Sequence, residues 1–168
     1  KSNAYGHGMA PVSRRAWECG VKWFAVAHVD EALELRTALP DAEVIVLGAM
    51  DPSDVVTAIE KNLVVTLVSE QHALALASQA VSRRETLRCH AEIDTGMGRL
   101  GFAWADAART LPRLAKRPGL NICGLYAHFA SSGAPKRTFA DIQAERFMKV
   151  ARYCEEEGMD IGFKHISN

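Results

Sequence analysis

The sequence predicts an α/β fold built on a parallel sheet, and three observations support this prediction. Short apolar runs alternate with helix-type segments along the whole chain, which is typical of repeated strand–helix units. Apolar residues make up 48% of the 168 positions, enough to bury a core. The later strands are polar on one face and apolar on the other, which suits a barrel whose lumen holds a ligand. Periodicity alone leaves an open doubly wound sheet as the alternative.

Strands and helices alternate three times in the first half of the chain. Residues 11–19 are expected to form a helix, because Pro11 suits a first turn and Gly20 suits a C-terminal stop. Continuous apolar runs predict buried strands at residues 23–27, 44–47 and 64–68. Helices are expected at residues 30–39, 51–61 and 69–82, the first of them ending at Pro40.

The second half continues the pattern and introduces polar strand faces. Strands are predicted at residues 87–94, 121–128 and 162–166, with helices at 104–116 and 138–157. Because side chains alternate along a strand, one side of residues 87–94 carries Arg88, His90 and Glu92. In the same way, one side of residues 121–128 carries Gly124, Tyr126 and His128.

Composition narrows the class of protein. Lys plus Arg and Asp plus Glu both number 20, and this balance argues against a nucleic-acid partner. The apolar runs are far shorter than a membrane span, and no charged-then-apolar leader opens the chain, so we expect a cytoplasmic location; a chain that lacks its beginning could hide a leader. The cysteines lie far apart with no C-x-x-C pair, which predicts buried thiols and neither a zinc site nor disulfides: Cys19, Cys89, Cys123 and Cys154.

The first eight residues hold the strongest functional signal. Lys1 heads a short polar run that contains Tyr5 and two glycines. Such a run suits a loop at the mouth of a site, because glycine lets the backbone approach a ligand closely. A lysine held there can carry an aldehyde cofactor as a Schiff base.

Residues 1–8 resemble the K-A-N-A-Y-G-H-G signature of the alanine racemase family, with Ser2 in place of the usual alanine. Residues 94–102 (DTGMGRLGF) and 126–130 (YAHFA) resemble further segments of that family in the same order. Residues 165–168 resemble its H-x-x-N-S segment, cut one residue short. The resemblance implies pyridoxal 5'-phosphate as cofactor, an N-terminal eight-stranded α/β barrel and a C-terminal β domain.

On this resemblance, residues 1–168 form one unit, a partial (β/α)8 TIM-like barrel with about six of the eight strands and without the C-terminal β domain. A complete barrel of this type needs about 250 residues. We therefore expect the chain to be part of a longer protein, inactive when taken alone.

The resemblance also implies roles for individual residues. Lys1 would bond the cofactor as an aldimine and abstract the α-proton on one face of the substrate, and Tyr5 would hydrogen-bond the cofactor phosphate. Arg99 would hydrogen-bond the cofactor's phenolic oxygen and the substrate carboxylate, a task that suits a planar guanidinium. His128 would stack on the pyridine ring, and Asn168 would lie near the phosphate.

Glu92 departs from the family pattern, in which a lysine carbamate or a neutral amide often occupies this place. We hypothesise that Glu92 supplies a carboxylate directly, in a charge-assisted pair with Arg99. His7 is interpreted as a loop hydrogen-bonder and His165 as a structural residue. No metal site is expected.

The implied activity is the interconversion of L-alanine and D-alanine, which needs a second base on the opposite face of the substrate. In the family that base is a tyrosine from the C-terminal domain of the partner subunit, which implies a homodimer; Tyr126 and Tyr153 do not match its motif. The alternatives are a racemase for serine, lysine or another amino acid, a non-catalytic barrel that binds pyridoxal phosphate, and an α/β domain with no cofactor.

Overall fold

The computed structural model describes residues 1–131, 133 and 138–168. Within these ranges six parallel strands pair in chain order: β1 (Trp23–Val26), β2 (Glu43–Ala49), β3 (Val64–Leu67), β4 (Leu87–Asp94), β6 (Leu120–His128) and β7 (Phe163–Ser167). A two-residue strand, β5 (Phe102–Ala103), pairs with the end of β4. The strand order never reverses, as it would in a doubly wound sheet, so that alternative is wrong and the chain forms a half-barrel.

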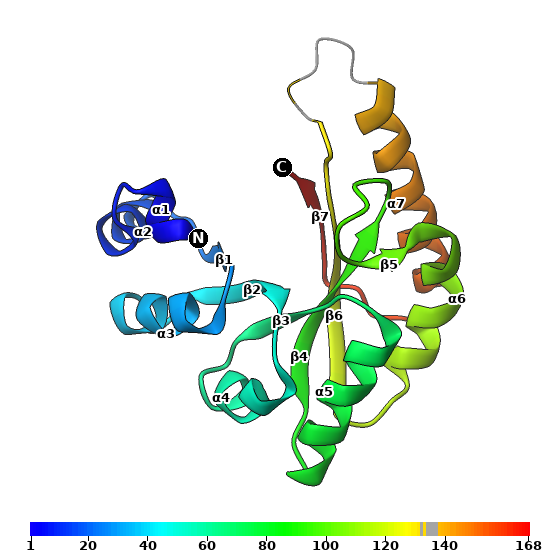
Figure 1. Ribbon diagram of the computed structural model, residues 1–168, viewed down its shortest axis with the longest axis horizontal. Helices are drawn as coiled ribbons and strands as arrows, with labels where there is room; N and C mark the ends of the chain where they lie inside the picture. The colour runs from blue at the N-terminus through cyan, green and yellow to red at the C-terminus, as the bar shows by residue number, and fades with distance from the viewer. Residues whose placement is uncertain (132, 134–137) are drawn as a thin grey trace.

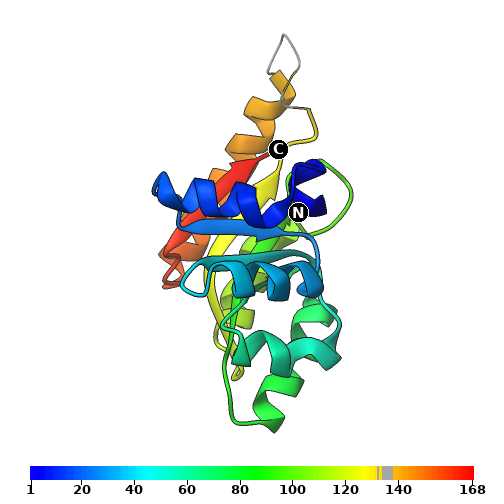
Figure 2. The same ribbon diagram turned by 90° about the vertical axis from the view of Figure 1, so that its left-hand side faces the viewer.

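Helices cover the outer side of this half-barrel. They are α2 (Met9–Glu18), α3 (Val29–Ala38), α4 (Val55–Glu60), α5 (Glu70–Ser82), α6 (Trp104–Ala115) and α7 (Thr138–Glu156). Figure 1 shows α3 to α7 following the outside of an arc of strands, with both chain ends towards its open side. Figure 2 looks from the β1 side, where α2 and α3 lie nearest to the viewer.

The two faces of the sheet carry buried apolar clusters of different size. The large core lies between the sheet and the helices and contains Cys89, Ala91 and Ile93 from one side of β4. A small cluster of Ile45, Val64 and Tyr126 lies on the concave side. The predicted alternation along β4 is therefore confirmed.

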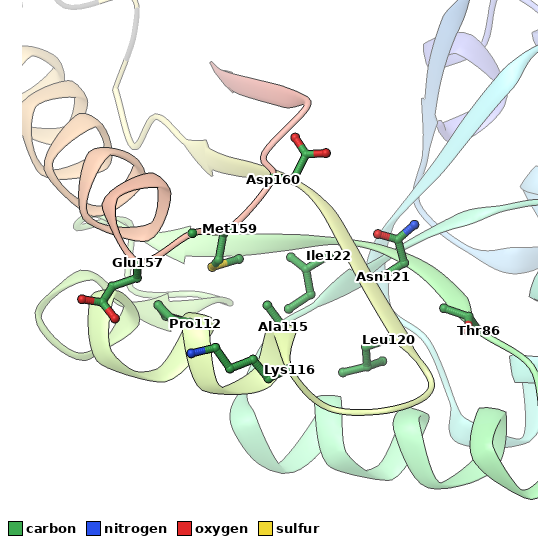
Figure 3. Close-up of a pocket in the computed structure, with 11 residues that line it drawn as sticks. Thr86, Pro112, Ala115, Lys116, Leu120, Asn121, Ile122, Glu157, Met159 and Asp160 are labelled. Atoms are coloured by element: carbon green, nitrogen blue, oxygen red, sulfur yellow. The ribbon is translucent and has the colours of Figure 1, made fainter.

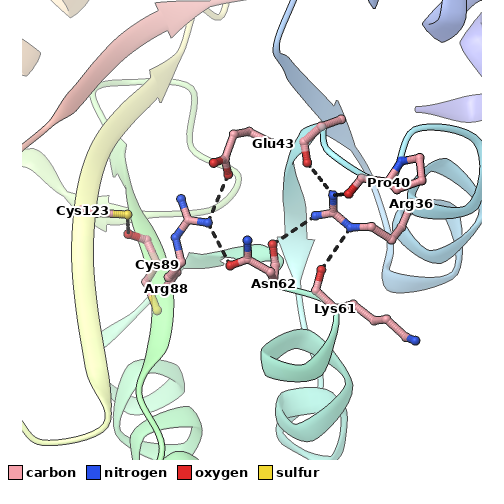
Figure 4. Close-up of polar contacts among 9 residues, drawn as sticks. Arg36, Pro40, Glu43, Lys61, Asn62, Arg88, Cys89 and Cys123 are labelled. Carbon is pink, nitrogen blue, oxygen red and sulfur yellow. Dashed lines mark hydrogen bonds and ion pairs between the residues drawn. The ribbon is translucent and has the colours of Figure 1, made fainter.

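Two arginines tie the amino ends of the strands together (Figure 4). Arg36 of α3 donates to four backbone carbonyl oxygens, those of Pro40, Ala42, Lys61 and Asn62. Arg88 at the start of β4 donates to the Glu43 carboxylate at 3.1 Å and to the Asn62 side-chain oxygen at 3.0 Å. These contacts fix the loops that lead into β2 and β3 at the end of the sheet opposite the predicted site.

Several expectations need correction. The helix expected at residues 51–61 is divided into a 3-10 turn, η1 (Pro52–Asp54), and α4, because the Asp51 side chain accepts the Ser53 N–H at 2.8 Å and begins a tight turn at Pro52. Cys19 is exposed rather than buried, since it ends α2 beside Gly20; Cys89 and Cys154 are buried as predicted and Cys123 is half-buried. No helix in the described part of the chain has the length and apolarity to cross a membrane.

Candidate active site

Lys1 is followed by a left-handed turn. Residues 2–5 were predicted to lie in a loop, but they form the one-turn helix α1 (Ser2–Tyr5), with φ of 52°, 51°, 53° and 55°. None of these residues is glycine, and the left-handed conformation costs L-residues about 1–2 kcal/mol each. Gly6, at φ 88°, ends the turn. Sequence reasoning missed α1 because the local signals for positive φ are weak: Asn3 alone within the turn, and the two glycines after it.

The glycine-rich segment after β4 places Arg99 over the end of that strand. The Asp94 carboxylate accepts the backbone N–H groups of Gly96 at 2.9 Å and Gly98 at 3.0 Å, which closes the turn. A Cβ on Gly101 would lie 2.7 Å from the Glu92 carbonyl oxygen, so only glycine allows the chain to return this close to β4.

Gln143 of α7 joins the ends of β4 and β6. Its side chain is fully buried, and its amide nitrogen donates to the Thr95 hydroxyl at 3.0 Å and to the His128 carbonyl oxygen at 3.1 Å. Its oxygen accepts the Ala130 N–H at 3.0 Å. The segments that carry Arg99 and His128 are thus held by one buried amide.

The predicted site residues gather around two adjoining cavities at the carboxyl ends of the strands. One, of about 260 Å³, is lined by Lys1, Tyr5, His128 and Asn168 among others. The second, of about 190 Å³, is lined by Lys1, Glu92, Arg99 and His128 among others. Both also contain Leu47 and Tyr126. The sequence therefore predicted which residues meet, while their roles stay predictions.

Tyr5 and Asn168 lie at the rim of the first cavity. The Tyr5 side chain is 74% exposed, and the Lys1 amine lies 5.8 Å from the centre of its ring. The Asn168 amide nitrogen donates to the Phe129 carbonyl oxygen at 2.9 Å, which fixes the end of β7 against the end of β6. Both side chains are thus placed where a ligand entering the cavity would meet them.

Among the described residues, no hydrogen bond or ion pair joins Glu92 to Arg99, contrary to our hypothesis, although both line the second cavity. In the described structure the Glu92 carboxylate, only 3% exposed, accepts the Tyr126 hydroxyl at 3.2 Å. The Tyr126 hydroxyl also lies 3.1 Å from the Thr66 hydroxyl, which donates to the Val46 carbonyl oxygen. Burial raises the pKa of Glu92, although the Tyr126 hydrogen bond and the charge of Arg99 lower it. Arg99 influences Glu92 through space, while Tyr126 holds it.

Histidines line the concave face below the cavities. His165 stacks on Tyr126 with ring centres 4.9 Å apart, and its Nε2 lies 3.4 Å from Nδ1 of the fully buried His90. Burial lowers the pKa of His90 to about 4 and lowers the pKa of His165. His165 packs within the concave face and also lines the first cavity.

His128 and His7 differ in their surroundings. Burial, Arg99 and Lys1 together lower the pKa of His128, so its imidazole is neutral at pH 7. The exposed His7 donates its backbone N–H to the Ala4 carbonyl oxygen, so its bond is made by the backbone and not by the ring.

A third hollow, of about 370 Å³, lies at the opposite end of the strands (Figure 3). It is formed by the end of α6, the start of β6 and the segment after α7. None of the predicted site residues lines it. Since parallel barrels build their active sites at the carboxyl ends of the strands, we place the candidate site at the two smaller cavities.

Sequence reasoning singled out neither Thr66 nor Leu47, and it gave Tyr126 no role in the site, noting that it belongs to the 126–130 segment and does not match the motif of the second base. Tyr126 is central to the site because it lines both cavities and connects Glu92 to Thr66. Its position on the inner side of a predicted strand was the signal that could have found it.

Comparison with known proteins identifies the family to which this chain belongs. A family model described as "Alanine racemase, N-terminal domain" matches residues 1–168. The chain belongs to the alanine racemase family. It is 37% identical over 168 residues to an alanine racemase of Carboxydothermus hydrogenoformans, covering 100% of this chain and 45% of that relative. It is also 37% identical over 169 residues to alanine racemase 2 of Caldanaerobacter subterraneus subsp. tengcongensis, covering 44% of it.

Solved structures of racemases superpose on this half-barrel. An alanine racemase from Clostridium difficile 630 in complex with cycloserine superposes with a TM-score of 0.92 at 28% identity, covering 99% of this chain and 46% of that one. A histidine racemase from Leuconostoc mesenteroides superposes with a TM-score of 0.86 at 25% identity, covering 98% of this chain and 44% of that one. The chain spans less than half the length of these relatives.

Proposed function

We propose that this chain is the barrel part of a pyridoxal 5'-phosphate-dependent racemase that interconverts L-alanine and D-alanine. The observation that carries the proposal is the placement of Lys1, Arg99 and His128 around one cavity at the carboxyl ends of the strands. These residues supply an amine, a cation and a neutral imidazole, a set of groups that suits proton transfer beside a carboxylate.

The residues present fit this cofactor. A primary amine faces the cavity from Lys1, and the neighbouring walls offer the Tyr5 hydroxyl, the His128 ring and the half-buried aromatic face of His165. When bound, the cofactor supplies an aldehyde that condenses with amines and a ring that withdraws electrons from the carbon next to the amine. An aromatic, partly polar cavity beside a lysine suits such a ring.

Each side chain has a distinct task in this proposal. Lys1 Nζ takes the proton from the substrate α-carbon on one face. Arg99 binds the substrate carboxylate with its guanidinium and keeps it oriented. His128, neutral at pH 7 because burial and two cations lower its pKa, packs against the cofactor ring without adding charge. Tyr5 and Asn168, at the rim, contact the phosphate.

Racemisation also needs a base on the other face of the substrate. In the described residues Tyr126 donates to Glu92 and is enclosed by Thr66 and His165, so it is held away from that role. We propose that a longer chain supplies the second base, from the partner subunit of a homodimer, and that residues 1–168 alone do not turn over D-alanine.

The identity of the substrate side chain has a second candidate that an observation favours. The same half-barrel superposes on a protein titled histidine racemase as well as on alanine racemases. A racemase for another amino acid, such as histidine, serine or lysine, is therefore the second candidate. Side-chain selectivity then depends on residues outside the two cavities described here.

The test uses the full-length protein, loaded with pyridoxal phosphate, and its variants Lys1→Ala and Lys116→Ala. Lys116 is an exposed lysine at the opposite end of the strands and serves as the matched control. We expect D-alanine to form from L-alanine with the wild type and with Lys116→Ala but not with Lys1→Ala, measured by chiral chromatography. Borohydride reduction followed by peptide mapping should place the cofactor on Lys1. A label on another lysine, or undiminished turnover by Lys1→Ala, would refute the proposal; faster turnover of a different amino acid would select the competitor.

A further inference from the structure

The left-handed turn after Lys1 needs an external contact to hold it. Four consecutive non-glycine residues, Ser2–Tyr5, have positive φ. Such backbone persists only where the surrounding structure over-determines it, and it is found preferentially at functional sites. At its far end the turn is fixed by the Asn3 side-chain oxygen, which accepts the Met9 N–H at 2.7 Å.

At its near end the turn is held by one carboxylate. Glu31, in the first turn of α3, accepts the Ser2 N–H on Oε1 at 2.5 Å and the Ala27 N–H on Oε2 at 2.7 Å. Ala27 directly follows β1, so the two oxygens join the lysine turn to the carboxyl end of a barrel strand. Burial raises the pKa of Glu31, but the backbone N–H groups of Ala27, Ser2 and Asn3 lower it by more, so the pKa lies below its ordinary value and the group is ionised at pH 7.

The effect of this contact falls directly on Lys1. The Ser2 N–H belongs to the peptide unit that follows the Lys1 Cα, and the Lys1 backbone nitrogen donates to the Ala25 carbonyl oxygen of β1 at 3.3 Å. The backbone of Lys1 is thus fixed on both sides of its Cα, once by β1 and once by Glu31. A side chain that starts from a fixed Cα reaches the cavity with less conformational freedom to lose.

We propose that Glu31 is a positioning residue, which holds the strained turn against β1 and thereby directs the Lys1 amine into the cavity. This inference rests on the proposed function, because the value of directing the amine lies in bonding the cofactor. It goes beyond it in assigning a residue on α3 that touches neither cavity.

The variants differ in how many acceptor oxygens they keep. Glu31→Ala removes both, and Glu31→Gln keeps one oxygen and turns a donor towards the second N–H group. Glu34→Ala is the matched control, because Glu34 is an exposed glutamate one turn further along the same helix. All three are made in the full-length protein, and Glu31→Gln remains informative if Glu31→Ala fails to fold.

The first measurement needs no cofactor. Hydrogen exchange of the Ser2 and Ala27 amides should become about tenfold faster or more in the Glu31 variants, since each loses a hydrogen bond to a charged group. Glu34→Ala should leave both rates unchanged. Unchanged exchange in the Glu31 variants would overturn the proposal whatever the function of the site.

The second measurement separates positioning from general stability. At saturating pyridoxal phosphate, borohydride incorporation at Lys1 should be about tenfold slower in Glu31→Ala, with an intermediate rate in Glu31→Gln. Protein that is merely less stable would incorporate cofactor at the wild-type rate, and that result would also overturn the proposal. If Lys1 of the wild type takes no label while exchange of the Ser2 and Ala27 amides still depends on Glu31, the proposed function is wrong and the positioning role falls with it.

Discussion

Gly124 of β6 provides the clearest structural test of the concave face. A Cβ at this position would lie 2.5 Å from His90 Nε2 and 2.6 and 2.7 Å from two further ring atoms, closer than real contacts allow. Gly124→Ala therefore forces the buried imidazole of the neighbouring strand to move. His90 has no free direction, because its ring centre lies 5.6 Å from those of Trp23 and His165 and 6.0 Å from that of Phe163.

The magnitude follows from this crowding. Overpacking a well-filled interior costs about 1–3 kcal/mol. We expect Gly124→Ala to fall in the upper half of the range, because every ring atom it meets belongs to a fully buried residue.

The assay is urea unfolding of the full-length protein, followed by circular dichroism. The matched control is Gly162→Ala, because a Cβ there would meet only the Cys123 carbonyl oxygen at 3.6 Å, an ordinary contact. In a His90→Ala background the Gly124→Ala penalty should shrink, since the clashing ring is gone. Equal penalties at Gly124 and Gly162, or a penalty that persists without the His90 ring, would show that the two residues do not compete for space.

Three further predictions concern buried polar groups in the full-length protein. The pKa of His90 is about 4 in the folded protein against an ordinary 6.5, so as pH falls the unfolded chain binds a proton first, and the free energy of unfolding should fall between pH 6.5 and 4. His90→Gln should remove this part of the fall, measured by urea unfolding at a series of pH values. Parallel plots of unfolding free energy against pH for the variant and the wild type would contradict this prediction. Burial raises the pKa of Glu92, so the wild type loses stability relative to its unfolded state as pH rises above 4.5. Glu92→Gln carries no such carboxyl, so its stability relative to wild type should grow as pH rises above 4.5. A difference that stays constant with pH would argue against burial of the Glu92 carboxyl. Gln143→Leu leaves the Ala130 N–H and Thr95 without a partner and should cost about 1–3 kcal/mol, measured by urea unfolding, whereas the exposed Gln79→Leu should cost little; similar losses would count against the bridge.

The strands were predictable because their signal is local. Val64 to Leu67 and Leu87 to Asp94 are recognised by apolar runs and by alternation, and both depend on burial of one or two sheet faces. The meeting of Arg99 and His128 was predictable for a second reason: Arg99 follows β4 and His128 ends β6, and the carboxyl ends of parallel strands share one edge. Lys1 was placed beside them through the family resemblance.

What the sequence did not predict depends on distant contacts. The strained turn α1 is contacted by Glu31, 29 positions from Ser2, and no propensity of Ser2, Ala4 or Tyr5 favours positive φ. The partner of Glu92 was misassigned for the same reason. Arg99 is its close neighbour in sequence and opposite in charge, but the side chain within hydrogen-bonding distance is Tyr126, on the adjacent strand β6.

The candidate site depends on the curvature of the sheet. In a flat sheet, β1 and β7 would be separated by five inter-strand spacings, about 24 Å at about 4.8 Å each. Instead Trp23 of β1 stacks on Phe163 of β7 with ring centres 4.9 Å apart and planes at 14°, so the two outermost strands of the sheet meet across the concave face. The same closure brings Lys1, hydrogen-bonded to β1, into one cavity with Asn168 at the end of β7. Any change that flattens the arc must therefore separate the amine from His128 and Arg99 before it disturbs the core beneath the helices, because that core lies on the opposite face.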